Sequence, residues 1–560
     1  MSAGRAHQGL WTVDSNRSRA DHQSVSYNLS ELFERVADAV PERPAVVCPT
    51  SRRSYAQLDS RATRLAHAFA ARGISRGDHI GLQLHNGVEF LEAMLAAYKL
   101  RAVPVNVNCR YVEPELAYLY DDADLVALVY HRALAPRIAP VLGRTPKLRA
   151  LFVVDDGSSV APIEGSSDYE QALGAGMTRR DFGKRSGDDL YLAYTGGTTG
   201  RPKGVMWRHE DIFFAAMGGG DPTTAQGPIS RPEELPERVL PVGAVMLLLP
   251  PLTHVSAQWG AFSILFGGGT VVLAAPGSLD PPEVWRLVED ERVNVLTIVG
   301  DAMARPLLDA FAADPNHYDV SSLLVFASGG AVLSPSTKAQ IAALLPNVIT
   351  IDGFGSTETG VIGTRTRLPG SEPEAGPRFT VGDHTAVLGD DMQQVAPGSG
   401  AIGCVARRGH IPLAYFKDPN RTAATFVDID GTRWALTGDA ATVEADGTVV
   451  FLGRGSVSIN TGGEKVYPEE VEVVVKDHPA VYDAIVVGTP HERWGEQVVA
   501  VVAPRSGSSV SLDEIRDHCR RSLADYKLPR ALCIVDRVER GPNGKGDYKW
   551  ARERALSARS

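Results

Sequence analysis

The clearest chemistry in the chain lies between Tyr194 and Gly204, a stretch that reads YTGGTTGRPKG. Its four glycines let the backbone turn sharply and approach a ligand closely. Three threonine hydroxyls, several backbone N–H groups and one lysine charge then face the same point, which suits a polyphosphate. The spacing is not that of a Walker A loop, because the pattern Gly-x-x-x-x-Gly-Lys-Ser/Thr does not occur here. A glycine-rich loop taken alone is more often a flexible surface loop.

A second motif, Asp352–Thr359, reads DGFGSTET. Small residues around the single aromatic residue, Phe354, would leave a slot for a flat base. Glu358 supplies a hard oxygen ligand of the kind that Mg²⁺ prefers. The alternative is an ordinary glycine turn between a strand and a helix, and the motif alone does not decide between the two.

Three more polar residues lie in short motifs that are common in any protein. Asp439 follows Thr-Gly and precedes Arg454, and a carboxylate that accepts from two hydroxyls suits a sugar, although a Gly-Asp pair is usually a turn. Lys545, in the loop Pro542–Asp547, would alone be a solvated charge. His254 would alone be a satisfied core histidine.

The elements that must position these motifs alternate between strands and helices. Residues 54–72 show the helical pattern, with Leu58, Ala62 and Leu65 on one face and Gly73 as the stop. This alternation predicts an α/β fold with mainly parallel sheets covered by helices. Such sheets place ligands beyond the carboxyl ends of their strands. The predicted strands are residues 44–48, 79–84, 102–107, 125–130, 190–193, 245–252, 269–275, 293–299 and 323–327, the predicted helices are 54–72, 88–100 and 283–291, and residues 218–243 are predicted to be a loop insertion.

The length of 560 residues predicts at least two structural units, because single cores stop growing at ~250–300 residues. We expect a poorly ordered N-terminus over residues 1–27, a large N-terminal domain over 28–454 and a small C-terminal domain over 455–560. Thr- and Val-rich segments before Gly453 predict a small, antiparallel, barrel-like β subdomain in the large domain. The C-terminal domain reads as α/β, with helices at 468–476 and 511–521 and strands at 484–487 and 498–502. Ser511 and Glu514 have the spacing of a capping box.

Composition excludes several classes of protein. The chain is 44% hydrophobic and carries a formal net charge of −10, so nucleic-acid binding, which usually needs a basic face, is not expected. Its five cysteines are scattered and contain no Cys-x-x-Cys pair. That pattern argues against a disulfide framework or a structural zinc site and suits a reducing cytosol.

Targeting signals are not evident in the sequence. Residues 1–16 lack the apolar segment of a signal peptide, and no apolar run reaches the ~18 residues needed to span a membrane. We therefore expect a cytoplasmic protein without a transmembrane segment. The sequence leaves open peripheral membrane contact and the oligomeric state, for which a homodimer is one alternative.

Taken in chain order, the motifs resemble those of the adenylate-forming enzymes, a superfamily of acyl-CoA synthetases, luciferases and peptide-synthetase adenylation domains. The resemblance covers roughly residues 29–550. It is closest to bacterial long-chain and sterol side-chain fatty-acyl-CoA synthetases. The stretches behind this are residues 194–211 (YTGGTTGRPKGVMWRHED), 300–306 (GDAMARP) and 453–471 (GRGSVSINTGGEKVYPEEV).

The resemblance implies a role for each motif. The glycine-rich stretch would hold the ATP phosphates, Phe354 would stack near the adenine, and Thr357 would contact the α-phosphate. Gly329, Gly330 and Ala331 would form the other wall of the adenine slot, and the loop with Gly462 and Gly463 would let the pantetheine arm of CoA pass close to the backbone. Glu358 would hold Mg²⁺, and Asp439 with Arg454 would hold the ribose. The implied catalytic residues are Lys545, Glu358, Thr195 and His254. The implied nucleotide and CoA contacts are Thr195, Gly196, Gly197, Thr198, Thr199, Gly200, Lys203, Gly329, Gly330, Ala331, Asp352, Gly353, Phe354, Gly355, Thr357, Asp439, Arg454, Gly462, Gly463 and Lys545.

The resemblance also implies a reaction and a mobile C-terminal domain. A carboxylic acid would attack the α-phosphate of ATP to give an acyl-AMP and pyrophosphate, and the thiol of coenzyme A would then displace AMP. ATP, Mg²⁺ and coenzyme A are the implied cofactors and co-substrates. Ser456 occupies the position of the family's pivot, where Asp or Lys is usual. Gln258, Trp259 and Phe262 would line an acyl tunnel.

A long or bulky hydrophobic acid, such as a fatty acid or a steroid side-chain acid, is the expected substrate. The glycines Gly260, Gly267, Gly268 and Gly269 lie near the presumed tunnel, and we expect their missing side chains to leave room for it.

Two other functions stay open at this stage. One is an adenylation enzyme that loads an acyl group on a carrier protein, which we expect less because no carrier module follows Lys545. The other is a non-catalytic nucleotide or acyl binder, against which the joint retention of the ribose, magnesium and lysine motifs argues. ATP–pyrophosphate exchange would separate enzyme from binder, and free CoA as acceptor would separate synthetase from carrier loader.

Overall fold

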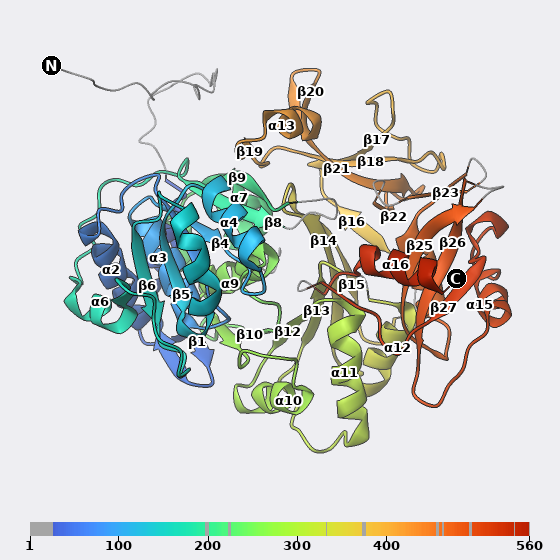
Figure 1. Cartoon of the computed structure of the whole chain (residues 1–560), viewed down its shortest axis with the longest axis horizontal. Coiled ribbons are helices and arrows are strands. Elements are labelled where there is room, and N and C mark those ends of the chain that lie inside the picture. The colour runs from blue at the N-terminus through green and yellow to red at the C-terminus, as the bar shows by residue number, and fades with distance from the viewer. Residues whose placement is uncertain are drawn as a thin grey trace.

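The computed structural model describes residues 26–195, 201–221, 226–331, 333–371, 377–454, 458–461, 464–491, 495–541 and 544–558. These residues form three sheets with helices between and around them (Figure 1). The predicted α/β class is therefore confirmed.

The first sheet has 14 strands in the order β17-β18-β21-β22-β16-β15-β14-β13-β12-β10-β11-β1-β2, with β20 paired to β21. From β1 to β14 all neighbours are parallel, apart from the β1–β2 hairpin. Beyond β14 every pair is antiparallel, as expected for the barrel-like part. Those strands continue the main sheet, because β16 pairs with both β15 and β22. The strands are β1 (Pro44–Cys48), β2 (Ser51–Ser54), β10 (Val245–Leu248), β11 (Thr270–Leu273), β12 (Val295–Ile298), β13 (Val325–Gly329), β14 (Ile349–Ser356), β15 (Gly360–Arg367), β16 (Arg378–Val381), β17 (Thr385–Leu388), β18 (Gly403–Arg408), β20 (Phe426–Ile429), β21 (Thr432–Val443) and β22 (Val449–Arg454).

The second sheet has eight strands in the order β19-β9-β8-β4-β3-β5-β6-β7. It is parallel from β8 to β7, and the β8–β9 hairpin and β19 add an antiparallel edge. Its strands are β3 (His79–Gln83), β4 (Val103–Asn106), β5 (Leu125–His131), β6 (Ala150–Val154), β7 (Ser167–Asp168), β8 (Leu190–Thr195), β9 (Lys203–Arg208) and β19 (Ala414–Tyr415).

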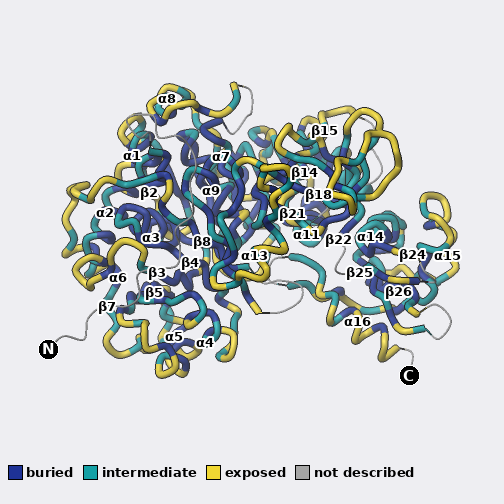
Figure 2. Tube along the Cα trace, turned by 90° about the horizontal axis from the view of Figure 1, so that it is seen from above, coloured by how far each residue is buried: buried dark blue, intermediate teal, exposed yellow. Residues whose placement is uncertain are grey.

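Helices fill the space between these two sheets and cover their outer faces. Helix α3 is buried along nearly its whole length, because it contacts β1 and β2 on one side and β3 and β4 on the other. Figure 2 shows the buried residues of this region in dark blue, between the two sheets. The inner helices are α1 (Leu29–Ala39), α2 (Tyr55–Ala71), α3 (Val88–Lys99), α7 (His209–Ala216) and α9 (Val255–Phe266); α10 (Pro281–Asp290), α11 (Gly300–Ala313) and α12 (Pro335–Leu344) cover the first sheet, and α4 (Glu113–Asp122) and α5 (Ala135–Ile138) the second. The remaining helices of this part are α6 (Tyr169–Ala175), α8 (Glu234–Glu237), which lies in the predicted loop insertion, and α13 (Pro419–Thr425).

We call the third sheet and its helices, from Ile459 to Ala558, the C-terminal unit, and the described residues before it the large unit. The sheet has five strands in the order β24-β23-β26-β25, with β27 beside β26. Residues of β25 alternate between two cores: Ala484 and Val486 pack with α14 and α15, and Ile485 and Val487 pack with α16. The elements are β23 (Ile459–Thr461), β24 (Glu464–Val466), α14 (Pro468–Lys476), β25 (Val481–His491), β26 (Gly495–Pro504), α15 (Leu512–Cys519), β27 (Ala531–Ile534) and α16 (Tyr548–Ser557).

Several local predictions can be compared with this fold. The capping box of Ser511 and Glu514 is present at the start of α15. Residues 1–25 of the predicted poorly ordered N-terminus lie outside the described residues, but Tyr27 is buried against Phe213 and Phe214 and so belongs to the core. Among the described residues, none of the helices combines the length and the apolar composition needed to cross a bilayer.

Candidate active site

The predicted phosphate-binding stretch, residues 194–204, connects β8 to β9, which pair as an antiparallel hairpin. Thr195 at the end of β8 pairs directly with Lys203 at the start of β9. The hydrogen-bonded ladder therefore fixes both ends of the turn and the position of the lysine. The predicted phosphate contacts Gly196, Gly197, Thr198, Thr199 and Gly200 lie outside the described residues.

Lys203 and Glu358, 155 residues apart in the chain, meet in an ion pair with 2.7 Å between Nζ and Oε1. Tyr415 completes the group: its hydroxyl donates to the same Oε1 at 2.7 Å and accepts from Lys203 Nζ at 3.0 Å. Burial, together with the Glu358 charge, raises the pKa of Tyr415, so the phenol stays a proton donor. Tyr415 lies in β19, which pairs with β9. The sequence analysis missed Tyr415, because only this pairing brings it beside Lys203.

The donor chemistry at Glu358 fits a magnesium ion that substrate phosphates help to hold. Mg²⁺ is usually bound by one or two carboxylates together with phosphate oxygens and water. Glu358 supplies one carboxylate, and Lys203 lies beside it where a phosphate would be neutralised. In the part of the chain that the structure describes, no group of three or more His, Cys, Asp and Glu side chains could hold a metal by itself.

The predicted adenine walls are adjacent strand ends of the first sheet. In the parallel β13–β14 pair, Gly329 lies opposite Gly353. A β-carbon at Gly329 would meet nothing within 4 Å, and Gly330 adopts a positive φ of 80°. Ala331 accepts a hydrogen bond from Ser328 at 3.2 Å, which fixes the turn after β13. These residues thus leave an open space at the carboxyl ends of two parallel strands, where ligands of such sheets bind.

Packing and hydrogen bonds hold the other residues of the DGFGSTET motif in place. The ring of Phe354 stacks on Phe379 with 5.0 Å between centroids, which holds it at the strand end. Gly355 is required by packing, since a β-carbon there would lie 2.2 Å from the carbonyl oxygen of Gly360. The carbonyl of Thr357 accepts from the Trp207 indole at 2.9 Å, which ties the motif to β9.

Asp352 is buried and engaged by the protein itself. Its Oδ2 lies 2.5 Å from Nζ of Lys338 on α12. Burial raises the pKa of the Asp352 carboxyl, and Lys338 opposes that shift. The side chain therefore ties β14 to α12, and a contact of Asp352 with the nucleotide stays a prediction.

The two predicted ribose residues face each other across antiparallel strands. Asp439 of β21 pairs with Arg454 of β22, and Asp439 is only 3% exposed. Gly438, with φ of 74°, makes the turn before it, and the amide of Asp439 donates to Thr437 Oγ1 at 2.9 Å. The side chain of Arg454 lies outside the described part, as do Gly462 and Gly463 of the predicted CoA loop and the predicted pivot Ser456.

The loop that carries Lys545 packs against the adenine wall. A β-carbon at Gly544 would lie 2.9 Å from Val299 Cγ1, and one at Gly330 would lie 3.9 Å from the same atom. Gly544 has a φ of 73°, so both its conformation and its packing favour glycine. The amide of Gly541 donates to the carbonyl of Lys545 at 2.8 Å, which closes the loop. Val299 thus lies between the glycine wall and the residue before Lys545.

His254 is the residue before helix α9, at its N-cap position, and is half-buried. Asn106, at the end of β4, connects the loop before His254 to the β8–β9 hairpin. The Asn106 amide donates to the carbonyls of Tyr194 and Thr253, both at 2.7 Å, and accepts from the Tyr194 amide at 2.9 Å. The sequence analysis missed Asn106, because it ends an apolar strand and belongs to no motif.

Substituting Asn106 by leucine should destabilise the fold. Leucine has a similar volume but would leave three buried backbone groups unpaired, and each such group costs about 1–3 kcal/mol. We expect Asn106→Leu to lower the free energy of unfolding by roughly 2 kcal/mol or more, measured by urea denaturation. Asn108→Leu, two residues away and more exposed, is the control; equal stability of the two variants would contradict the role of Asn106.

The predicted acyl-tunnel glycines do not all leave space. A β-carbon at Gly269 would lie 2.4 Å from the Ala244 carbonyl oxygen, and one at Gly268 would lie 2.5 Å from Val239 Cγ1. Gly268 and Gly269 allow the turn between α9 and β11 to pack closely against Val239 and Ala244, so the prediction that these two glycines leave room for a tunnel is wrong. Gly260 is different, since its nearest neighbours would be at 3.6 Å or more. The predicted lining residues Gln258, Trp259 and Phe262 are all buried on α9.

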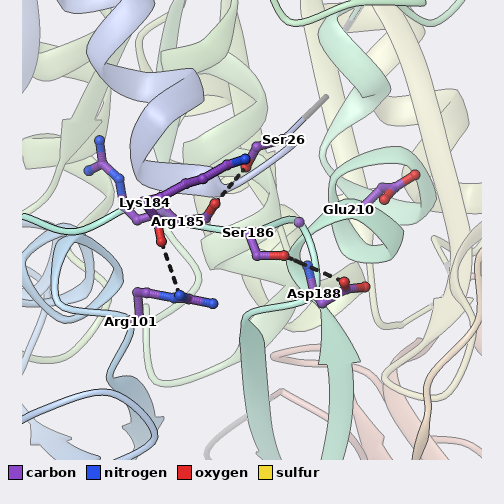
Figure 3. A pocket seen from close by; sticks show the side chains of 8 residues that line it. Ser26, Arg101, Lys184, Arg185, Ser186, Asp188 and Glu210 are labelled. Atoms are coloured by element: carbon purple, nitrogen blue, oxygen red, sulfur yellow. Dashed lines mark hydrogen bonds between the residues drawn. The ribbon is translucent and has the colours of Figure 1, made fainter. Parts of the chain in front are cut away.

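A surface cavity of about 230 Å³ lies elsewhere, at the start of the described chain (Figure 3). Its two arginines are already paired: Arg101 with Asp189 at 2.7 Å, and Arg185 with Glu34 at 2.6 Å. It contains none of the predicted site residues. We assign it no part in the site.

Comparison with known proteins agrees with this geometry. The family model described as AMP-binding enzyme matches residues 33–411, and the model of its C-terminal domain matches residues 470–545. The chain is 47% identical over 534 residues to a 3-oxocholest-4-en-26-oate–CoA ligase of Rhodococcus rhodochrous, covering 94% of this chain and 96% of that protein. It is 48% identical over 533 residues to a medium/long-chain-fatty-acid–CoA/3-oxocholest-4-en-26-oate–CoA ligase of Mycobacterium tuberculosis, covering 95% and 96%.

Solved structures share the fold. The anthranilate CoA ligase AuaEII in complex with anthranoyl-AMP superimposes with a TM-score of 0.81 at 24% identity, covering 96% of this chain and 99% of that one. ATP-bound MatB of Rhodopseudomonas palustris gives a TM-score of 0.77 at 25% identity, covering 96% and 100%. With a family model that matches most of its length and two relatives at nearly half identity, this chain belongs to the AMP-binding enzyme family.

Proposed function

We propose that this enzyme joins a hydrophobic carboxylic acid to coenzyme A, with an acyl-AMP as the intermediate. The observation that carries the proposal is the convergence of three distant segments at the carboxyl ends of β13 and β14. Lys203 pairs with Glu358 there, and Val299 lies between Gly330 and Gly544, the neighbour of Lys545. The lysine–carboxylate pair, with the loop of a second lysine packed beside an open glycine slot, suits ATP and a reaction at its phosphates.

In the first step, the acid oxygen attacks the α-phosphorus and the bond to pyrophosphate breaks. Lys203 and Lys545 would offset the negative charge that builds on the phosphoryl oxygens. Asn106 would hold the hairpin at a fixed distance from the loop of His254, beside which the carboxylate is proposed to bind. Mg²⁺, when bound at Glu358, would neutralise phosphate charge. In the second step, the CoA sulfur attacks the acyl carbon and AMP leaves.

We propose a long or bulky hydrophobic acid as the substrate. The two relatives at 47% and 48% identity are named for steroid side-chain and medium/long-chain fatty acids, and the residues of α9 proposed to line the tunnel include Trp259 and Phe262. Apolar pockets discriminate by only ~1–3 kcal/mol per methylene, so selectivity should be graded along a chain-length series.

A coupled AMP-release assay over acetate, medium and long fatty acids, a small aromatic acid and a steroid side-chain acid tests this substrate class. We expect kcat/KM to rise with apolar size. Highest kcat/KM for acetate or for the small aromatic acid would overturn the assignment.

The same assay separates the remaining alternatives. Thioester formation with free CoA supports the synthetase, and thioester formation only with a phosphopantetheinylated carrier protein supports a carrier loader. Binding of ATP without ATP–pyrophosphate exchange would support a non-catalytic binder. Five points stay predictions: the bound Mg²⁺, the cytoplasmic location, the homodimer, peripheral membrane contact and the domain boundary after residue 454.

A further inference from the structure

Arg305 of α11 is a buried arginine at the junction of the large unit and the C-terminal unit. Its side chain is 1% exposed. On its own unit, the guanidinium donates to Ser334 Oγ, Ser336 Oγ and Thr337 Oγ1, each at 3.2 Å. Asp301, one helical turn earlier, lies 3.4 Å away and balances the charge. The arginine is therefore held firmly by α11 and the start of α12.

The same guanidinium donates to three backbone carbonyls of the C-terminal unit. It reaches Lys476 at 3.2 Å, Val481 at 3.0 Å, and also Tyr482. Lys476 is the last residue of α14, where the helix dipole favours a cation, and Val481 begins β25. Its five N–H donors in a planar fork suit several carbonyls at once, which a lysine ammonium would not. Figure 1 shows the C-terminal unit beside α11 and α12.

A second arginine continues the contact toward Lys545. Asp483, next to Tyr482, holds Arg540 through two hydrogen bonds of 2.6 and 2.8 Å. Arg540 in turn donates to the carbonyl of Gly544 at 3.0 Å. A continuous series of hydrogen bonds and adjacent residues thus runs from α11, through the start of β25, to the residue before Lys545.

We propose that Arg305 is a positioning residue for the acyl-AMP-forming step. It docks the start of β25 on the large unit and, through Asp483 and Arg540, sets Lys545 against the nucleotide site. The inference rests on the proposed function, because it assumes that Lys545 acts on ATP. It assigns a role to a residue that lies outside the proposed binding site. It also predicts which half of the reaction depends on that residue.

The physical basis is the free-energy cost of leaving buried backbone carbonyls at the junction without a hydrogen-bond donor. Hydrogen bonds to charged groups contribute more than neutral ones, and an unpaired buried carbonyl is costly. Without the guanidinium, the Val481 and Tyr482 carbonyls at the junction lose this donor and the Lys476 carbonyl keeps only Ser336, so the docked arrangement loses stability relative to an undocked one. The large unit keeps its own core, since the hydrophobic cluster under α11 is formed by other side chains, among them Leu307, Leu308 and Phe311.

Arg305→Met tests the proposal, because methionine keeps much of the volume but none of the donors. We expect ATP–pyrophosphate exchange, which reports acyl-AMP formation, to fall about tenfold or more. Conversion of supplied acyl-AMP to acyl-CoA should stay within about twofold of the parent enzyme, because Lys545 is not needed in that step. Arg305→Lys should lie between the two, and Ser336→Ala, which removes the hydroxyl that bonds both Arg305 and the Lys476 carbonyl, should show a smaller effect in the same direction.

The matched control is Arg292→Met, which removes an arginine of the same unit that is 61% exposed and pairs with Asp319. It should leave both half-reactions unchanged. If Arg305→Met lowers both half-reactions by the same factor, or leaves the exchange reaction intact, Arg305 does not position Lys545. If the parent enzyme itself shows no exchange with any acid, the proposed function fails, and that result is distinct from a failure of the Arg305 proposal.

Discussion

Lys545→Ala is expected to abolish acyl-AMP formation while sparing the conversion of supplied acyl-AMP to acyl-CoA. The loop of Lys545 packs against Val299 beside Gly330, and we expect its ammonium to contact the carboxylate and the α-phosphate only in the first step. Removing one such stabilising group typically costs about 10²–10³ in rate. ATP–pyrophosphate exchange measures the first half-reaction, and release of AMP from synthetic acyl-AMP in the presence of CoA measures the second.

Lys549→Ala is the matched control for this substitution. Lys549 lies four residues further along, is exposed on α16, and should tolerate alanine in both assays. Equal loss of the two half-reactions in Lys545→Ala would mean that the lysine supports the fold or the thioester step, and would contradict the assignment.

Glu358→Gln is expected to have the second-largest effect. Glutamine keeps the shape of the side chain but loses the charge that pairs with Lys203 and that would bind Mg²⁺. We expect exchange activity to fall by about 10². ATP with Mg²⁺ should raise the melting temperature of the enzyme, and we expect the variant to need a higher Mg²⁺ concentration for the same rise. This measurement reports metal binding without relying on turnover.

Glu237→Gln, at an exposed position on α8, is the control for charge removal. A Glu358→Gln variant whose melting temperature responds to Mg²⁺ and ATP as the parent does would show that the metal is held elsewhere.

Local signals explain why most of the fold could be predicted from the sequence. Ser54 and Ser511 both form capping boxes, so the starts of α2 and α15 follow from residues three apart in the chain. The strands of the parallel core are short apolar runs between such helices, and each predicted run overlaps an observed strand. The prediction for residues 323–327 began two residues early, because Leu323 and Leu324 precede the ladder in which β13 starts at Val325.

The site was predicted only where a motif carries it. Lys203, Glu358 and the glycines of β13 and β14 lie in recognisable stretches, and the structure places them together. Asn106, Tyr415 and Arg305 were given no role, because the partners that define their roles are 57 or more residues away in the chain. Such contacts arise from strand pairing and unit docking, which leave no local pattern.

Glycine was the residue most easily misread. Gly268 and Gly269 were expected to leave room for an acyl chain, yet their missing side chains are filled by Val239 and by the Ala244 carbonyl. At Gly329 the same absence does leave open space. Sequence alone does not distinguish a glycine that makes room from one that allows close packing, since both lack a β-carbon.

The β8–β9 hairpin restricts how the length of its turn could change during evolution. Successive strand residues point to opposite faces of a sheet, so a one-residue slip of β9 would turn the position of Lys203 away from Glu358. The same slip would expose the face that buries Trp207. An insertion or deletion between β8 and β9 that shifts this register would disturb both the ion pair and the core. Related chains that keep this ion pair should therefore vary little in the number of residues between β8 and β9.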